Sequence, residues 1–224
     1  MFSRYFIATL VCIAPIIGNP IKIKTRQSCS VIHFVHAAGA TEEGLGGLGT
    51  PISVALSKEI PGTTSYGVPY DTSPYNGTVE YNNTITEGAA LTTQHLRDQA
   101  AQCSDQRFIL SGASKGAIVL HSTNFDSKIK RKVLAVLVFG DPGRNDPAFN
   151  NSWPINSPIF NLNPRNGIAS TENVVSFCND GDTICETGKA DPNALPLPHF
   201  TYAQDGSVEI AVNYIKAKVQ SNSW

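Results

Sequence analysis

The stretch Arg107–Ala117, with the sequence RFILSGASKGA, constrains the fold more than any other part of the chain. Its apolar run Phe108–Leu110, between Arg107 and a Ser-Gly pair, is typical of a buried strand. A second apolar segment, typical of a helix, begins at Ala117. Between them lies Gly112–Gly116, a G-x-S-x-G pattern in a strand–turn–helix context. The two glycines let strand and helix approach closely around a serine on a strained turn. Ser114 is therefore a candidate nucleophile, although such turns also use Gly and Ser for purely steric reasons.

Residues 1–18 have the features of a secretory signal peptide. A basic residue, Arg4, precedes the apolar run Tyr5–Ile17, which Pro15 interrupts and the small residue Gly18 follows. A membrane anchor is the competing interpretation, but the run is shorter than the ~20 apolar residues that span a bilayer. We therefore expect secretion, without membrane insertion.

The next basic residues indicate a short pro-segment that extends to residue 26. Four of the 17 Lys and Arg residues (Arg4, Lys22, Lys24 and Arg26) precede Gln27, and no acidic residue does. A chain that begins at Gln27 has 13 basic residues against 18 acidic ones. This mildly acidic balance argues against a nucleic-acid or anionic-lipid surface.

Four of the five cysteines remain once Cys12 is removed with the signal peptide, an even number in an oxidising compartment. Cys178 and Cys185 flank a short loop, so we expect them to pair, which leaves Cys29 with Cys103. A zinc site is the alternative, but the sequence has no C-x-x-C pair. Three glycosylation sequons also fit secretion from a eukaryotic cell; their asparagines are Asn76, Asn82 and Asn150.

The order of apolar patterns predicts an α/β fold. With 224 residues, 41% of them hydrophobic, one domain at 27–224 is the default. Strands are expected at 30–36, 64–70, 107–111, 133–139 and 173–177, and helices at 51–60, from Thr84 or Thr86 to 102, at 115–124 and at 208–219. The stretch 141–167 shows no periodicity. Alternating strands and helices predict a three-layer α/β/α sandwich around a mostly parallel five-stranded sheet, with ligands at the carboxyl ends of the strands.

A serine nucleophile needs a histidine base, and that base needs an acid that fixes its tautomer. In elbow enzymes the chain order is Ser, then Asp or Glu, then His. Of the two histidines after Ser114, His121 lies about two turns along the helix that the serine begins, so we interpret it as a packing or surface residue. His199 follows a Pro-rich loop and is the candidate base.

Three aspartates compete for the acid. Asp182 follows the last predicted strand, inside the loop bounded by Cys178 and Cys185, so a disulfide there would fix its position. Asp141, in Gly-Asp-Pro-Gly, has the features of a turn residue at a strand end and is the second choice. Spacing alone does not decide which side of its loop Asp180 faces.

The chain resembles the cutinase family of small secreted α/β-hydrolases, which also contains acetylxylan esterases. The resemblance rests on the elbow 112–116, the segment Cys178–Cys185 (CNDGDTIC) and the segment 198–202 (PHFTY), and it extends from Cys29 to about Val219. It implies a Ser114–Asp182–His199 triad, and disulfides between Cys29 and Cys103 and between Cys178 and Cys185. It implies a monomeric serine esterase without metal or organic cofactor, whose substrate is a polyester or an acylated polysaccharide.

The resemblance also implies an oxyanion hole, formed by the backbone N–H groups of Ala40 and Lys115. Family members usually have Arg-Gly-Ser/Thr in the first loop, where this chain has Ala38-Gly39-Ala40, so one hydroxyl donor is missing. Loss of such a donor can cost ~10² to 10³ in rate. The usual Tyr and Gln of the elbow are Ala113 and Lys115, and a cation at a helix N-terminus is mildly unfavourable unless paired.

Two further patterns in the sequence suggest other functions. Gly44–Gly49 matches the dinucleotide pattern G-x-G-x-x-G, but its first glycine lies well after the strand end, and we favour a flexible loop beside the site. A polymer-binding pseudo-esterase gains weight from the missing hydroxyl. Among substrates, the apolar residues 194–198 and Ile85 favour a groove for an acyl chain, and hence cutin or other aliphatic esters over acetylated xylan.

Overall fold

The structure is a computed structural model that describes residues 29–144, 159–162, 173–187 and 197–221. The predicted signal peptide at 1–18, the predicted pro-segment up to residue 26 and the sequon asparagine Asn150 lie outside the described residues.

A parallel sheet forms the centre of the fold, with strand order β2-β1-β3-β4-β6-β5. The strands are β1 (Ile32–Ala37), β2 (Thr64–Gly67), β3 (Arg107–Ala113), β4 (Val133–Phe139), β5 (Ile159–Leu162) and β6 (Val174–Phe177). Five of the six overlap the predicted strands, and β4 matches its predicted bounds. The sixth, β5, adds an edge strand within the stretch 141–167, for which the sequence predicted no element, because four residues are too few to show a period.

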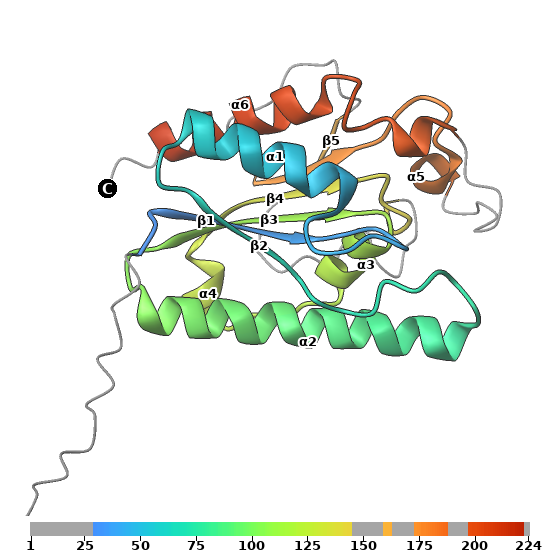
Figure 1. Ribbon diagram of the computed structural model, residues 1–224, viewed down its shortest axis with the longest axis horizontal. Helices are drawn as coiled ribbons and strands as arrows, with labels where there is room; N and C mark the ends of the chain where they lie inside the picture. Colours follow the sequence, from blue (N-terminus) through green and yellow to red (C-terminus); the bar gives the residue numbers. More distant parts are fainter. Residues whose placement is uncertain (1–28, 145–158, 163–172, 188–196, 222–224) are drawn as a thin grey trace, which may run out of the picture.

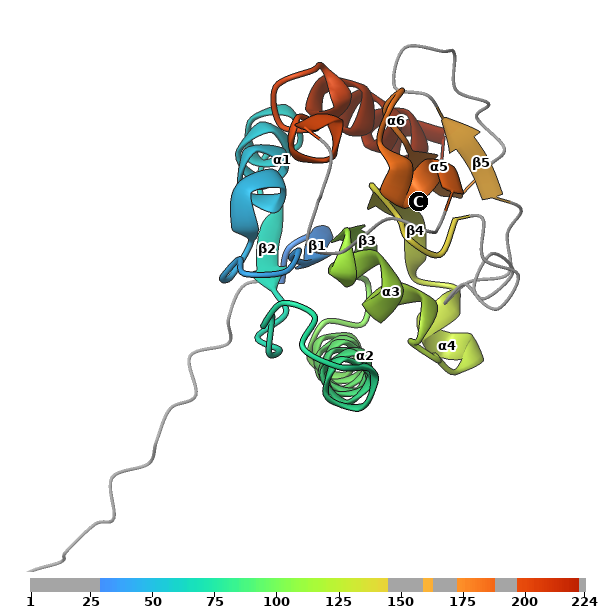
Figure 2. The same cartoon turned by 90° about the vertical axis from the view of Figure 1, so that its right-hand side faces the viewer.

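Helices cover both faces of the sheet, as Figures 1 and 2 show. Helices α1 and α6 pack on one face and α2, α3 and α4 on the other. The helices are α1 (Gly46–Glu59), α2 (Thr78–Gln102), α3 (Lys115–His121), α4 (Ser127–Lys130), α5 (Thr183–Thr187), the 3-10 helix η1 (Leu197–Phe200) and α6 (Ser207–Ser221). The predicted three-layer α/β/α sandwich is confirmed.

The strand side chains alternate between two hydrophobic cores. Val35, Leu110 and Val136 belong to the core beneath α2 and α3, whereas Phe34 and Ile109 belong to the core beneath α1 and α6. All seven residues of β4 are buried, as its continuous apolar run predicted.

Helix α1 begins at Gly46, five residues earlier than predicted, and contains Pro51. Gly46 has φ +60°, and the Gly47 N–H donates to the carboxylate of Glu42 at 2.8 Å. A carboxylate at the N-terminus stabilises a helix through the unpaired N–H groups of its first turn. Most of the predicted glycine-rich loop is therefore the first turn of α1.

Two disulfides, Cys29–Cys103 and Cys178–Cys185, are present, and they are the two pairs expected from the sequence. The first joins the segment before β1 to the residue after α2, and in the chain-entropy model this long closure contributes about 4 kcal/mol. The second closes the seven-residue step from the end of β6 to α5. It therefore fixes the loop that contains Asp182.

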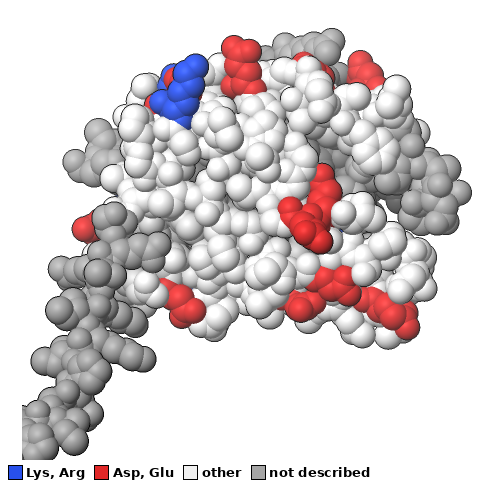
Figure 3. Space-filling model, in the orientation of Figure 1, with Lys and Arg blue, Asp and Glu red and all other residues white. Residues whose placement is uncertain are grey.

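Within the described residues, no helix has both the length and the hydropathy needed to cross a bilayer. On the face in Figure 3, acidic side chains are scattered and basic ones are visible at one place near the upper left. This face thus has no broad basic surface, in line with the composition of the chain.

Candidate active site

Ser114 lies at the junction of β3 and α3, in a backbone conformation that side chains rarely adopt, with φ +49° and ψ −118°. Its N–H donates to the Phe139 carbonyl at 2.9 Å. The flanking glycines are sterically required: a Cβ on Gly116 would lie 1.9 Å from the Ala37 carbonyl oxygen, and one on Gly112 would lie 2.5 Å from the Gly116 oxygen. The serine therefore occupies the strained turn that the sequence pattern predicts.

His199 and Asp182 form a buried pair beside the elbow. The imidazole Nδ1 lies 2.9 Å from Asp182 Oδ2 and 3.0 Å from Oδ1. The Tyr202 hydroxyl donates to Oδ2 at 2.6 Å, and the Ile184 N–H donates to Oδ1 at 3.1 Å. Burial and the bond to Asp182 raise the pKa of Tyr202, so this hydroxyl remains a donor. The carboxylate thus has three donors around it and orients the imidazole through Nδ1.

Asn179 connects the loop that contains Asp182 to the segment that contains His199. The two hydrogens of its side-chain amide are shared among three acceptors, the Pro198 carbonyl at 3.1 Å, Thr201 Oγ1 at 3.0 Å and Asp205 Oδ2 at 2.6 Å. Its backbone N–H donates to the Tyr202 hydroxyl at 3.1 Å. Two segments that are separate in sequence are therefore fixed relative to each other.

Gly140, directly after β4, lies against this pair. Its φ is +55°, and a Cβ there would lie 2.7 Å from Cε1 of His199 and 3.1 Å from Oδ2 of Asp182. Only glycine meets both the backbone and the space requirements of this position.

The other candidate residues occupy different places. His121 is fully buried and its Nε2 lies 2.9 Å from Oδ2 of Asp141, so the second-choice acid contacts the histidine that we interpreted as a packing residue. Asp180 is exposed. Of the three aspartates, the structure places Asp182 against His199.

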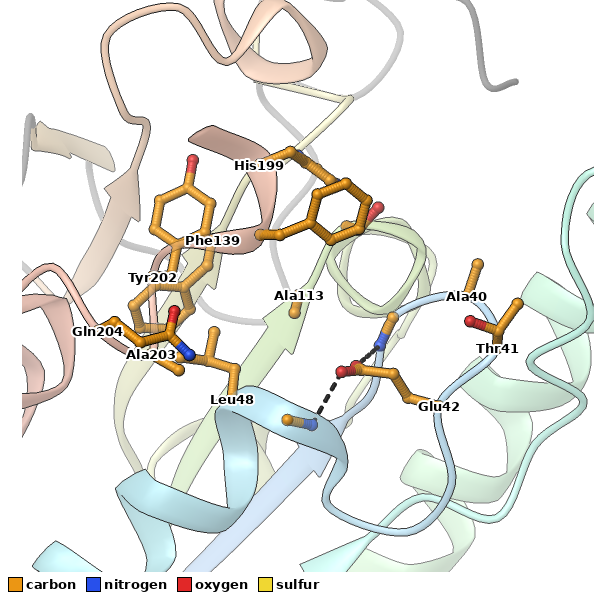
Figure 4. A pocket seen from close by; sticks show the side chains of 14 residues that line it. Ala40, Thr41, Glu42, Leu48, Ala113, Phe139, His199, Tyr202, Ala203 and Gln204 are labelled. Atoms are coloured by element: carbon orange, nitrogen blue, oxygen red, sulfur yellow. Dashed lines mark hydrogen bonds between the residues drawn. The ribbon is translucent and has the colours of Figure 1, made fainter. Parts of the chain in front are cut away.

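Ser114 and His199 line one pocket with a volume of about 280 Å³. The remaining lining comes from residues 39–42, Gly47 and Leu48, from Ala113 and Phe139, and from residues 200 and 202–204. In Figure 4, Leu48, Tyr202, Ala203 and Gln204 lie on one side of Ala113, and Ala40, Thr41 and Glu42 lie on the other. No hydrogen bond joins Ser114 to His199 in the described part of the chain; such bonds are often long before substrate binds.

The loop after β1 presents one free backbone donor beside the serine. The Gly39 N–H donates to Glu42 Oε2 at 2.8 Å, and the Thr41 N–H donates to the Thr72 carbonyl at 2.7 Å. Among the described residues the Ala40 N–H between them has no acceptor, and Ala40 lines the pocket. Figure 4 shows Glu42 accepting from the backbone on both sides, at Gly39 and at Gly47.

Lys115 provides the second potential donor, since a residue in the first turn of a helix has no intrahelical acceptor for its N–H. Its side chain is buried, and Nζ donates to the carbonyls of Asp71 at 2.9 Å and Ser73 at 2.8 Å. Burial lowers the pKa of Lys115. The expected unfavourable cation at the helix N-terminus is thus paired with backbone oxygens of a neighbouring loop.

The predicted acyl groove needs correction. Ile85 does not border it: this residue is buried in the core, because it lies on the stripe of α2 that includes Ala89, Thr92 and Leu96. Residues 194–196 lie outside the described residues. Leu197 is 77% exposed and Phe200 is 61% exposed, so apolar surface flanks His199 on η1.

Sequence reasoning missed several residues of the site. Glu42 and Thr72 hold the first loop, and Tyr202 binds Asp182. Tyr202 lies within the segment PHFTY, which already singled out His199, so that segment was the available signal. Nothing in the spacing connected Thr72 to Glu42, 30 residues away.

The described residues contain no group of three or more His, Cys, Asp or Glu side chains that could hold a metal ion. The predicted sequon asparagines Asn76 and Asn82 are both exposed, Asn76 before α2 and Asn82 on it. Both positions are open to modification, and their glycosylation stays a prediction.

Comparison with known proteins agrees with the resemblance. The sequence profile of the cutinase family matches residues 28–219. A cutinase of Trichoderma harzianum is 28% identical over 194 residues, which cover 83% of this chain and 67% of that relative. The chain spans 49% to 67% of the length of the first curated fungal cutinases that it matches.

Solved structures give the same result for the fold. The chain is similar to a Trichoderma reesei cutinase in complex with a C11Y4 phosphonate inhibitor, with a TM-score of 0.63 and 22% identity over 85% of this chain and 77% of that chain. It is also similar to an acetyl xylan esterase, with a TM-score of 0.64 and 18% identity over 86% of this chain and 100% of that chain. With the profile match over nearly the whole chain, the protein belongs to the cutinase family.

Proposed function

We propose that the protein is a serine esterase that hydrolyses carboxylic esters through an acyl-enzyme. The observation that carries this proposal is the placement of a strained Ser114 and a carboxylate-bound His199 in the wall of one pocket. Membership of the cutinase family, with cutinase and carboxylesterase relatives, supports the same reaction class.

Each residue has a defined step. His199 Nε2 takes the proton of Ser114 as its Oγ attacks the ester carbonyl carbon, and Asp182 stabilises the imidazolium. The N–H groups of Ala40 and Lys115 stabilise the oxyanion of the tetrahedral intermediate. The C–O bond to the alcohol breaks, and His199 returns its proton to the leaving oxygen. Water, deprotonated by the same imidazole, then hydrolyses the acyl-enzyme.

Aliphatic esters such as the polyester cutin fit the pocket better than acetyl esters. Leu48, Ala113, Phe139 and Ala203 provide apolar lining, and a cavity of about 280 Å³ exceeds what a two-carbon acyl group fills. A profile with p-nitrophenyl esters of increasing chain length tests this preference. We expect kcat/KM to rise beyond acetate; activity confined to acetate would instead favour the alternative, an acetylxylan esterase.

We further propose that the enzyme is secreted as a single catalytic domain comprising residues 27–224 and acts as a monomer. Two disulfides support an oxidising compartment. Glycosylation at Asn82 would place a glycan on the exposed side of α2.

The alternative is a pseudo-esterase that binds a polymer without cleaving it, since Ala40 lacks the usual hydroxyl. The free Ala40 N–H argues against it, because a backbone donor remains available. Hydrolysis of p-nitrophenyl butyrate by the wild type, compared with Ser114→Ala, separates the two functions. We expect the wild type to turn over and the variant to show the background rate; equal rates would rule out the esterase.

A further inference from the structure

Lys115 places a buried positive charge one residue after the candidate nucleophile. The side chain is 2% exposed, and its ammonium contacts the carbonyls of Asp71 and Ser73. Its Nζ also lies 5.1 Å from the ring centre of Tyr81 and 5.6 Å from that of Tyr70. A desolvated ammonium needs strong partners, and these contacts supply them. They fix the segment 70–73 against the elbow.

The same segment holds the loop that presents the free N–H of Ala40. The Thr72 carbonyl accepts from the Thr41 N–H at 2.7 Å, and Thr72 Oγ1 donates to the Glu42 carbonyl at 2.7 Å. Thr72 lies between the two residues whose carbonyls bind the Lys115 ammonium. One short connection therefore runs from the elbow through Thr72 to the loop.

On the other side of Ala40 the contact comes from Tyr70, whose hydroxyl donates to the Ala38 carbonyl at 2.5 Å. The segment that Lys115 binds thus holds the loop at Ala38 and at Thr41, on both sides of Ala40. Thr41 has φ +67°, a conformation that a non-glycine residue keeps only when its surroundings enforce it.

From these contacts we infer that Lys115 is a positioning residue, whose side chain holds the loop 38–42 so that the Ala40 N–H faces the oxyanion. This role rests on the proposed esterase function. This positioning compensates for the hydroxyl donor that Ala40 lacks, because the remaining backbone N–H can stabilise the oxyanion only when the loop holds it in the correct place. A misplacement of about 1 Å can cost ~10² in rate.

Two isosteric substitutions break the connection at different points. Lys115→Met removes the ammonium and keeps the apolar stem, and Thr72→Val removes the hydroxyl that donates to Glu42. The matched controls are Lys218→Met and Thr92→Val. Lys218 is a buried lysine whose Nζ lies 5.4 Å from the Tyr214 ring on α6, and Thr92 is a buried threonine that donates within α2. Circular dichroism and Tm confirm that each variant is folded.

For p-nitrophenyl butyrate we expect Lys115→Met and Thr72→Val each to lower kcat by about 10- to 100-fold with KM within about 2-fold of the wild type. The inhibition constant of butylboronic acid, which forms a tetrahedral adduct on serine, should rise by the same factor. Because both residues belong to one connection, the kcat of the double variant should be at most about 3-fold below that of the less active single variant. The controls should match the wild type.

Hydrogen exchange of the peptide covering residues 38–42 gives a readout that needs no activity. We expect faster exchange in Lys115→Met than in Lys218→Met, because the Thr41 N–H loses a fixed acceptor. Unchanged exchange, an unchanged boronic acid constant or fully additive losses in the double variant would overturn the positioning role. Failure of the esterase proposal looks different: the wild type would show no hydrolysis that depends on Ser114, while the exchange rate of the loop would still depend on Lys115.

Discussion

The described residues contain two buried histidine–aspartate pairs, and only the histidine of one pair, His199, lines the pocket. His199 and Asp182 are 2.9 Å apart, as are His121 and Asp141, and none of the four side chains is more than 3% exposed. Both aspartates follow parallel strands, β6 and β4, at the carboxyl end of the sheet. The two pairs are therefore alike in residue types, burial and spacing.

The difference lies in which nitrogen the aspartate uses and in where the histidine lies. Asp182 binds Nδ1 of His199, so Nε2 is not engaged by the carboxylate, and His199 lines the same pocket as Ser114. Asp141 binds Nε2 of His121. His121 also lies seven residues after Ser114 on α3, and a rise of 1.5 Å per residue moves it about 10 Å along the helix. A buried His–Asp pair by itself is thus a structural feature. Its histidine is a candidate base only where it lines a pocket together with a nucleophile.

Substituting the two histidines should give the largest contrast. His199→Gln should lower kcat by about 10⁵-fold or more, as removal of the general base does in serine hydrolases. His121→Gln should leave kcat per folded molecule within about 3-fold but lower the free energy of unfolding by about 1 to 3 kcal/mol, because Asp141 loses the imidazole contact and keeps the Gly143 N–H. Ester hydrolysis and urea denaturation measure the two effects. Equal losses of kcat would mean that the two pairs are not distinct in role.

Substituting the two aspartates should give the same contrast between a loss of kcat and a loss of stability, with a smaller effect on kcat. Asp182→Asn should lower kcat by about 10⁴-fold, since the amide no longer fixes the imidazole tautomer. Asp141→Asn should cost about 1 to 3 kcal/mol of stability with kcat retained. The kinetics are measured with saturating p-nitrophenyl butyrate, and a similar kcat for the two variants would contradict the assignment of Asp182.

Gly140 offers a steric test of the same pair. Gly140→Ala places a Cβ 2.7 Å from His199 Cε1, so the imidazole must move, and we expect a loss of about 10² in kcat. Gly62→Ala is the control, because Gly62 also has a positive φ, +85°, but no atom lies within 4 Å of its Cβ position. The control should lose about 1 kcal/mol of stability and no activity. Full activity in Gly140→Ala would show that the pair tolerates displacement.

The histidines that are not hydrogen-bonded to a carboxylate should determine the acid sensitivity of the fold: His33 and its partner His95 near the amino end of β1, and His36 near the carboxyl end of the same strand. Nε2 of His33 lies 2.8 Å from Nε2 of His95, and Nδ1 lies 2.7 Å from Thr64 Oγ1. Burial, together with the charge of His95, lowers the pKa of His33 to about 4, and burial lowers that of His36 to about 3.

Because these pKa values are lower in the folded state, the unfolded chain binds protons first as the pH falls below about 6.5. Stability should therefore decrease from pH 6.5 towards pH 4, by about 3 kcal/mol for His33 alone. Urea denaturation across this range should show that the free energy of unfolding depends less steeply on pH for His33→Asn than for the wild type. An unchanged slope would mean that His33 is not the sensitive group.

The sequence predicted the elements whose patterns are strong. Strand β4 coincides with its apolar run, and the order Ser, Asp, His selected the residues that the structure brings together around the pocket. The choice of Asp182 was possible because Cys178 and Cys185 restrict its loop, whereas Asp141 has no such restraint in the sequence.

Long-range contacts account for what the sequence could not predict. The side chain of Lys115 reaches carbonyls more than 40 residues away, and Ile85 faces the core because of how α2 packs. The start of α1 at Gly46 depends on Glu42, since glycines alone indicate a loop. In each case the deciding partner is distant or belongs to a loop without periodicity.

Covalent labelling shows directly whether His199 activates Ser114 as a nucleophile. A p-nitrophenyl alkylphosphonate loses p-nitrophenolate when a serine activated by a base attacks its phosphorus, so one equivalent should be released per folded molecule. Peptide mass mapping should place the alkylphosphonyl group on Ser114, and His199→Gln should react far more slowly while His121→Gln reacts like the wild type. Labelling of another residue, or equal rates in the two histidine variants, would mean that Ser114 and His199 do not act as nucleophile and base.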